Sequence, residues 1–340
     1  MSYVYITEQG AIVKKSGNRL RVILGSETLR WISVTSVKQL VIMGNVQLTS
    51  QAVHLCLRFS VDTIFLNYAG KYIGRLLGPI PAYSKLRWAQ YKFFHDEINT
   101  LEFVKKVIKG KIINQRRLLL KRTKPTTATT ELRRLAQKTE KAGSIDIARG
   151  YEGRSAAIFF GAFGGLITNS DFSFETRNRQ PPRDPVNILL SLGYTILLAR
   201  VESIVHQTGL DIALGGLHFP ENGKPALPLD LVEEFRPLIV DSTVLKCINL
   251  KILKKDDFVD AKSAIDYLKN NHGDIIRPVL FQKSAMSKFL TQLDAKFNSK
   301  VFYPPFAAKL SYKDVVLQQT RLLIRNLNNE DKYMAFTPNF

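Results

Sequence analysis

The sequence predicts an α+β protein, with a small N-terminal β-sandwich-like domain over residues 1–84 and a larger all-α domain over residues 85–340. Apolar and polar residues alternate through most of the first domain, which is typical of half-buried strands. From Lys85 onward, apolar residues recur at helical spacing instead. A Gly-Pro-Ile-Pro segment at 78–81 lies where the period changes. With 340 residues and 45% hydrophobic content, the chain can bury a sizeable core in two domains.

The N-terminal domain is expected to consist of strands rich in Val, Ile, Phe and Tyr, residues that favour strands. A Ser-Gly-Asn turn at 16–18 separates the first two. One amphipathic helix over 49–60 interrupts the strands, with Thr49 or Ser50 as its N-cap. The expected strands lie in 3–15, 18–25, 37–44 and 62–78.

The C-terminal domain is expected to be a set of helices joined by polar loops. A low-complexity loop covers 123–131, and a basic, proline-rich connector covers 173–185. The tail after Tyr333 carries no motif and is interpreted as disordered or as a partner-binding strand. The expected helices span 85–122, 130–148, 152–168, 184–208, 228–250, 278–298 and 310–327.

Basic residues far outnumber acidic ones. Forty-nine Lys and Arg against 29 Asp and Glu give a formal charge of +20 and a pI near 9.9. Such a field attracts polyanions, so nucleic acid is the first partner expected and an anionic membrane surface the second. We expect no apolar stretch of the roughly 20 residues that a membrane span needs, and the N-terminus alternates instead of forming the apolar block of a signal peptide. A membrane partner is therefore not predicted.

The two cysteines, Cys56 and Cys247, each stand in an apolar setting. They are interpreted as buried thiols of a reducing compartment, which predicts a cytoplasmic location. Neither cysteine supports a zinc site or a disulfide framework.

Residues 104–149 contain fourteen basic side chains and only three acidic ones. A run of this kind is commonly a solvated helical face. In a chain with this net charge, contact with a nucleic-acid backbone is the favoured interpretation. The contacts predicted within this run are Arg116, Arg117 and Arg122.

The stretch "ARGYEGRSAAIFFGAF" at 148–163 places one acid, Glu152, among many small residues. The small residues indicate that something approaches the helix backbone closely. The simpler interpretation of Glu152 is an acid in a first helical turn, where it interacts favourably with the helix dipole. The alternative is a metal ligand or a general base.

A second stretch, "LGGLHFPENGKPALPLDLVEEFRP" at 214–237, carries a histidine and an acid cluster. His218 follows two glycines and a leucine in a predicted loop. A lone histidine in such a loop is usually a structural imidazole and less often a ligand or catalyst.

Three acids share one face of the helix expected after this loop. Asp230 lies three residues before Glu233 and four before Glu234. Like charges on one face are destabilising unless a metal ion or Arg236 compensates them. The structural alternative is that Asp230 complements the helix end, with Glu234 a solvated residue paired with Arg236.

Taken together, Glu152, His218 and Glu233 would supply two carboxylates and one imidazole, a set that suits Mn²⁺ or Mg²⁺. Such an ion can neutralise charge at a phosphodiester and activate a water or a DNA hydroxyl. The sequence contains neither a phosphate-binding glycine loop followed by Lys-Ser/Thr nor a Gly-x-Ser-x-Gly elbow. The residues alone therefore predict a basic, metal-binding enzyme that acts on nucleic acid.

Four motifs resemble those of a known family: "GYEGRSAAIFF", "RDPVNILLSLGYTILLARV", "GLHFP" and "LPLDLVEEFRPLIVD". In this order and at these separations they are similar to the CRISPR-associated spacer-acquisition endonuclease/integrase family, the Cas-one proteins. The resemblance covers essentially the whole chain. It implies that the N-terminal domain mediates homodimerisation and that the helical domain is catalytic. It also implies that Glu152, His218 and Glu233 are the catalytic ligands of Mg²⁺ or Mn²⁺, with Asp230 as an auxiliary group.

The resemblance implies a reaction on double-stranded DNA in the prokaryotic cytoplasm. Two homodimers would bind a small dimeric Cas-two partner as a hetero-hexamer and hold a protospacer duplex. The protospacer 3′-hydroxyls would then attack phosphodiesters at a CRISPR repeat, a transesterification, while hydrolysis would use water instead.

In the second motif, Asp184 and Pro185 are expected to be the N-cap and first residue of a helix. Arg183 and Asn187 are predicted to contact DNA or the active site. Two other functions fit parts of the pattern. One is a non-catalytic DNA-binding scaffold of the same fold, and the other is an RNA-binding helical protein, which fits the charge but not the acids.

Overall fold

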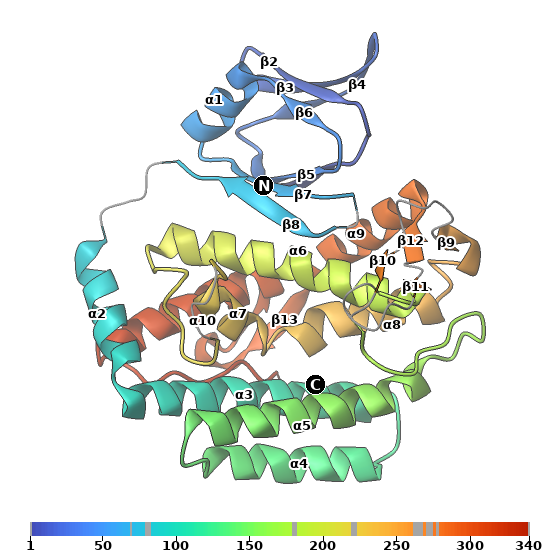
Figure 1. The fold of residues 1–340 in the computed structure, drawn as a ribbon. Coiled ribbons are helices and arrows are strands. Elements are labelled where there is room, and N and C mark those ends of the chain that lie inside the picture. Colours follow the sequence, from blue (N-terminus) through green and yellow to red (C-terminus); the bar gives the residue numbers. More distant parts are fainter. Residues whose placement is uncertain are drawn as a thin grey trace. The chain divides into compact units, whose positions relative to one another are not determined.

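The computed structural model describes residues 2–68, 70–78, 83–178, 182–218, 223–260, 268–269, 275–276 and 279–338. The chain forms two compact units, Met1–Pro81 and Ala82–Phe340. The first is built mainly of strands and the second mainly of helices (Figure 1). The predicted fold class, a β-rich N-terminal region followed by a helical domain, is confirmed.

The N-terminal unit contains two four-stranded sheets. Its buried core includes Ile6, Val13, Leu20 and Leu40, each with no exposed surface. The first sheet has the order β1 (Ser2–Ile6), β5 (Val37–Met43), β7 (Asp62–Leu66) and β8 (Tyr72–Leu76), parallel except for the last pair. The second has the order β4 (Glu27–Ser33), β3 (Arg19–Leu24), β2 (Ile12–Ser16) and β6 (Gln47–Leu48), with only the last pair parallel.

Two details of this unit differ from the sequence-based expectation. The alternating run at 3–15 is not one strand, because Gly10 adopts a φ of +80° that favours glycine and sends β1 and β2 into different sheets. Strand β4 was not predicted. The expected helix is present as α1 (Ser50–Arg58), and Thr49 is its N-cap, accepting a hydrogen bond from the Ala52 amide.

The helical unit begins with α2 (Ser84–His95) and α3 (Glu97–Leu120). The expected single segment 85–122 is divided at Asp96, whose side chain caps α3 by accepting from the Asn99 amide. Helices α3, α4 (Thr127–Glu140) and α5 (Ile145–Phe163) pack against one another (Figure 1). The remaining α-helices are α6 (Pro185–Thr208), α7 (Ala226–Val232), α8 (Ser242–Asn249), α9 (Lys283–Asn298) and α10 (Tyr312–Leu327), and a π-helical segment, Pro237–Asp241, directly precedes α8.

Short strand pairs lie among these helices, so the unit is not purely helical. The last of these pairs directly precedes α10. The pairs are β9 (Phe258–Asp260) with β12 (Val279–Phe281), β10 (Leu268–Lys269) with β11 (Ile275–Ile276), and β13 (Lys300–Tyr303) with β14 (Ala308–Ser311).

Helix α6 is a core helix of this unit. Its length and composition would suffice to cross a membrane, so the expectation that no apolar stretch reaches that size is wrong. However, 78% of its apolar window is buried inside the protein, as in the core helices of globular domains. The predicted start is confirmed, because Asp184 accepts a hydrogen bond from the Asn187 amide and Pro185 is the first helical residue.

Candidate metal centre

Glu152 lies in the interior of α5. The helix begins after Ser144, whose side chain caps it, so Glu152 is well beyond the first turn. The dipole interpretation is therefore wrong, because that effect fades within the first turn. The flanking glycines Gly150, Gly153 and Gly161 face open space, since an added Cβ at each would meet no described atom within 4 Å. Within the described chain, nothing packs closely on the glycine side of the helix, and helical spacing turns this side away from Glu152.

Lys111 of α3 joins the acids predicted to bind metal. Its ammonium contacts Glu152 Oε1 and lies 2.6 Å from Glu233 Oε2. Arg236 is 3.1 Å from the other oxygen of Glu233. Lys111 and Glu233 are only 6% and 3% exposed, so the fold brings Glu152 and Glu233 around one buried cation.

Glu233 is held as a carboxylate by these neighbours. Burial alone would raise its pKa, but Arg236, Lys111 and His218 together lower it to about 2. Its Oε2 atom accepts no hydrogen bond of good geometry from the residues that the structure describes, although the Lys111 ammonium is near. A buried, charged oxygen of this kind is a suitable ligand for a cation.

His218 is fixed by Asp230 of α7. Asp230 has no exposed surface, and its two oxygens accept hydrogen bonds from the backbone amides of Gly216, Leu217 and His218 at 2.7 to 3.0 Å. The His218 Nδ1 atom lies 2.8 Å from Asp230 Oδ1. With Nδ1 used in this way, Nε2 is the ring nitrogen available to a metal.

The glycine before this loop is required by the same contact. An added Cβ at Gly215 would lie 2.7 Å from Asp230 Oδ2 and 2.9 Å from the α7 backbone. Only glycine lets the loop approach this closely. Gly215 thus lets the loop approach Asp230, whereas an added Cβ at Gly216 would meet Thr100 of α3.

The donor set fits a hard divalent cation. Glu152 and Glu233 are neighbours through Lys111, and His218 is close enough to Glu233 to lower its pKa. Within the described ranges, no three His, Cys, Asp or Glu side chains are already gathered as a metal cluster. The cation between the two carboxylates in this structure is the Lys111 ammonium.

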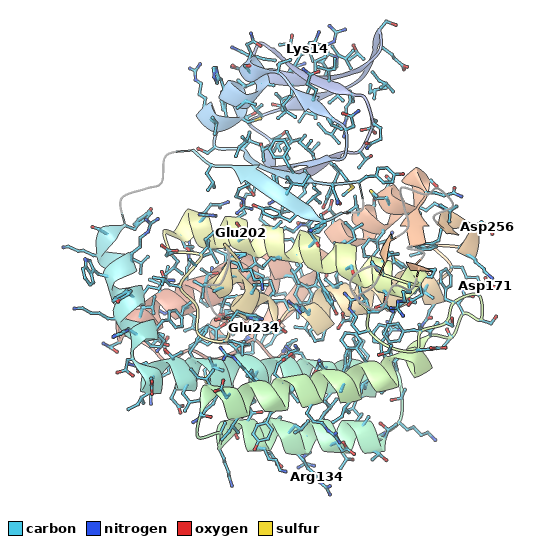
Figure 2. All side chains as sticks on the ribbon, in the orientation of Figure 1. Lys14, Arg134, Asp171, Glu202, Glu234 and Asp256 are labelled. Atoms are coloured by element: carbon cyan, nitrogen blue, oxygen red, sulfur yellow. The ribbon has the colours of Figure 1, made fainter. Side chains whose placement is uncertain are left out.

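Glu234 does not occupy the solvated position expected for it. It has no exposed surface, and Figure 2 shows it inside the helical unit. It accepts hydrogen bonds from the Tyr333 hydroxyl at 2.6 Å and from the Phe336 amide. Burial raises its pKa to about 7, against the effect of these bonds. Arg236 pairs with Glu233 instead.

The interpretation of the C-terminal tail as disordered is wrong for the described residues 334–338. Tyr333 and Phe336 are each only 3% exposed. Asn114 Nδ2 on α3 donates to the backbone oxygens of both Glu234 and Phe336 at 2.8 Å. The tail therefore packs inside the unit, against Glu234, which follows the C-terminal end of α7.

The predicted DNA contacts differ in accessibility. Arg183 and Arg122 are exposed, whereas Arg116 and Arg117 are half-buried. Arg116 Nε donates to the Thr129 carbonyl at 3.0 Å. Partial desolvation lowers the pKa of Arg117, and the charge of Arg116 adds to this effect. Partial desolvation of the guanidinium also lowers the pKa of Arg122, although the side chain as a whole is exposed.

Asn187 does not fit a direct DNA contact. Its side chain has no exposed surface, and its amide donates to the Thr176 carbonyl at 2.9 Å and to Asp184 at 2.6 Å. Its Oδ1 accepts from Arg177 at 2.7 Å. Asn187 thus anchors the connector to the start of α6.

Sequence reasoning missed two kinds of residue. Lys111 was counted only as one member of the basic run, because nothing in its local sequence indicates that it faces two distant acids. Exposed cations of α4 were also not singled out. Arg133, Arg134 and Lys138 are exposed and form no ion pair within the described chain, and Figure 2 shows Arg134 pointing away from α4.

Comparison with known proteins assigns this chain to a family. The family model described as "CRISPR associated protein Cas1" matches residues 4–276. A protein from Thermus thermophilus named "CRISPR-associated endonuclease Cas1 3" is 32% identical over 329 residues, 96% of this chain and 94% of its own. A Cas4 exonuclease/Cas1 endonuclease fusion from Geobacter sulfurreducens is 31% identical, and the match covers 99% of this chain and 60% of the fusion.

Solved structures show the same fold. A Cas1 protein from Thermotoga maritima superposes with a TM-score of 0.85 at 22% identity, covering 99% of this chain and 100% of its own. A casposase bound to an integration product gives 0.83 at 21% identity, covering 99% and 93%. The match of the family model over most of the chain, the similarity to full-length relatives and the β-then-α fold agree, and the protein belongs to the Cas1 family of CRISPR-associated proteins.

Proposed function

We propose that this protein is a divalent-metal-dependent DNA endonuclease and integrase of CRISPR adaptation, which inserts protospacer DNA into the CRISPR array. The observation that carries the proposal is the placement of Glu152 and Glu233 around one buried cation, beside a histidine whose Nδ1 is fixed by Asp230. The names of the Thermus relative, an endonuclease, and of the casposase bound to an integration product support it.

Glu152, Glu233 and Nε2 of His218 would hold Mg²⁺ or Mn²⁺. When bound, the ion would neutralise charge on a scissile phosphodiester and activate the attacking hydroxyl of DNA or water. Asp230 orients the imidazole through its contact with Nδ1. Arg236 keeps Glu233 ionised, so the ligand is ready at neutral pH.

The exposed cations of α4 and the open glycine side of α5 form the adjoining DNA surface. The two helices pack against each other. Arg134 and Lys138 have no competing carboxylate in the described chain and can neutralise phosphates. Gly150, Gly153 and Gly161 would let a DNA backbone come close to the open side of α5. Arg122 and Arg183 would add further contacts.

The protein would act as a homodimer through its N-terminal unit, with two dimers binding a Cas2 dimer in a hetero-hexamer on protospacer and repeat DNA. A neighbour in fold is named "Cas6-RT-Cas1--Cas2 complex", at a TM-score of 0.83 and 23% identity, which supports a Cas2 partner.

The test is a strand-joining assay with a labelled protospacer duplex, a plasmid that contains the repeat, and Cas2. Wild type, Glu152→Ala, His218→Ala and the control Glu140→Gln, an exposed acid of α4, are compared with Mn²⁺, Mg²⁺ or EDTA. We expect joining that requires metal, is lost in both site variants and persists in the control. DNA binding should remain in all four proteins.

Strand joining that survives Glu152→Ala and His218→Ala would overturn the assigned site. Tight, salt-sensitive DNA binding without joining in wild type would favour the alternative, a non-catalytic DNA-binding scaffold of the same fold.

A further inference from the structure

Helix α2 presents aromatic rings to solvent, although apolar side chains of this size are usually buried. Trp88 and Tyr91 are 63% and 50% exposed, and His95 is also exposed. Spacings of three and four residues place the three side chains on one face. We call this set, Trp88, Tyr91 and His95, the aromatic face of α2.

The rings of the aromatic face form a continuous ladder. Trp88 and Tyr91 meet edge to face with centroids 6.0 Å apart. Tyr91 and His95 stack with centroids 5.6 Å apart and planes within 7° of parallel. The ladder presents flat π-surfaces that are held in place by their neighbours, which lowers the entropy lost when a ligand stacks on them.

The charge around the aromatic face favours a polyanion. Lys85 and Lys92 of the same helix are exposed, and α2 contains no Asp or Glu. We propose that this face binds an unpaired strand of DNA, with bases stacked on Trp88 and Tyr91 and phosphates near the two lysines. Aromatic rings interleaved with cations are the combination that binds single strands without sequence preference.

An unpaired strand fits the face better than a duplex does. In a duplex the bases stack on one another and only their edges and the phosphates are accessible, so exposed aromatic rings gain little from it. A single strand offers the face of each base. The paired DNA ends of the proposed reaction would then have to separate before reaching α2.

The inner side of α2 is joined to the loop that carries His218. Gln90 has no exposed surface, and it donates to the carbonyls of Asp211 and Leu214 and accepts from the Asp211 amide, all at 2.8 Å. The loop also packs on the α2–α3 corner, where an added Cβ at Gly216 would lie 3.0 Å from Thr100. A strand on the aromatic face would therefore be bound to α2, the helix that contacts the loop carrying His218.

This link to the chemistry rests on the proposed function, but the binding itself can be measured without metal. The chain has two tryptophans, so Trp31→Phe leaves Trp88 as the single reporter. We would titrate this variant with a 12-nucleotide oligothymidylate in EDTA and record tryptophan emission. The expected result is saturable quenching that weakens as salt is raised.

Two further variants in the same background define the site. Tyr91→Ala should raise the Kd of the oligothymidylate about ten-fold through loss of one base stack. Ile98→Ala is the matched control, because Ile98 is 77% exposed nearby but offers no ring. Its Kd should not change. A 12-base-pair duplex, with binding followed by anisotropy, should bind without comparable quenching of Trp88.

Equal quenching by duplex and single strand, or an unchanged Kd in Tyr91→Ala, would overturn the proposal. A blue shift of Trp88 emission as protein concentration rises without DNA would assign the face to a protein interface instead, which also overturns it. Adding Glu152→Ala separates the two proposals, because quenching should persist in that variant whether or not strand joining depends on Glu152.

Discussion

The Lys111 ammonium lies 2.6 Å from Glu233 Oε2 in a site where both residues are buried. The same ammonium contacts Glu152, which comes from a different helix. The two acids proposed to bind metal are thus compensated by a cation of the chain itself. A divalent ion bound by these carboxylates would have to displace that ammonium.

Replacing Lys111 by Met should destabilise the metal-free protein. Glu152 and Glu233 would lose their shared cation, while Glu233 would keep Arg236, so we expect the loss of one charge-assisted contact, about 2 kcal/mol. Saturating Mn²⁺ should restore more thermal stability to this variant than it adds to wild type. Differential scanning fluorimetry with and without Mn²⁺ measures both effects. Lys109→Met is the control, because Lys109 pairs with Glu140 at the surface. An equal Mn²⁺ response in Lys111→Met and wild type would contradict the expectation.

Asp230→Asn should weaken metal binding with little effect on DNA affinity. The amide has one acceptor oxygen and would point its NH₂ group at the loop amides or at His218 Nδ1, so the imidazole would lose its orientation. Loss of a group that orients a metal-bound histidine weakens affinity about 10- to 100-fold. Calorimetric titration with Mn²⁺ tests this, with the exposed Asp146→Asn as control. Wild-type affinity in Asp230→Asn would show that Asp230 does not orient the ligand.

Tyr333→Phe should lower the free energy of unfolding by about 1 to 3 kcal/mol, because the Glu234 carboxyl would lose a buried donor. Urea denaturation measures the change. Tyr68→Phe, at a position where the ring is 46% exposed, should be nearly neutral. Similar stability of both variants would mean that the tail contributes little to the unit.

Asp241 should make stability fall as pH rises toward neutrality. Burial raises its pKa from 3.8 to about 7, although the Tyr194 hydroxyl donates to it at 2.5 Å. Because the folded state holds the proton more tightly than the unfolded one, this stabilisation is complete below pH 3.8 and is lost as pH passes about 7. The difference in the free energy of unfolding between Asp241→Asn and wild type should therefore shift in favour of the variant from pH 5 to pH 8. Urea denaturation at both pH values measures this difference. A constant difference across this range would exclude the buried titration.

Arg134→Ser combined with Lys138→Ser should weaken DNA binding uniformly across sequences. If each side chain neutralises one phosphate, the slope of log affinity against log salt should become shallower by about 2. Fluorescence anisotropy over a NaCl series measures this slope. Lys309→Ser, an exposed lysine of β14, is the control. An unchanged slope in the double variant would remove α4 from the DNA surface.

Much of the fold could be predicted from local sequence patterns. The caps at Thr49 and Asp184 could be predicted because the capping residue and the helix it starts are adjacent in sequence. The Asp96 break within a long helical pattern was missed, since the periodicity continues on both sides of it. The start of α5 was predicted at residue 152, but the helix begins at Ile145, because helical periodicity also continues across the break between α4 and α5. The prediction therefore put Glu152 at a helix end instead of inside the helix.

In the candidate site too, features encoded by neighbouring residues could be predicted, and contacts between distant residues could not. The resemblance implied Glu152, His218 and Glu233 as a set with Asp230 as an auxiliary group, but the contact of Asp230 with the His218 imidazole is visible only in the structure. Lys111 could not be assigned, because its contacts join α3 to α5 and α7, and such pairings exist only after the helices pack. The burial of Glu234 depends on residues about a hundred positions later in the chain, so its local sequence suggested an ordinary surface acid.

The docking of residues 333–338 behind α7 has a consequence for biosynthesis. These residues follow every helix of the unit, so the ribosome makes them after α3, α7 and α10 have all been translated. Until they emerge, Glu234 lacks the Tyr333 hydroxyl and the Phe336 amide, and Asn114 lacks one of its two acceptors. The nascent helical unit therefore completes its interior only once residues 333–338 have been made, and a chain that lacks them leaves the Glu234 carboxyl without these two donors.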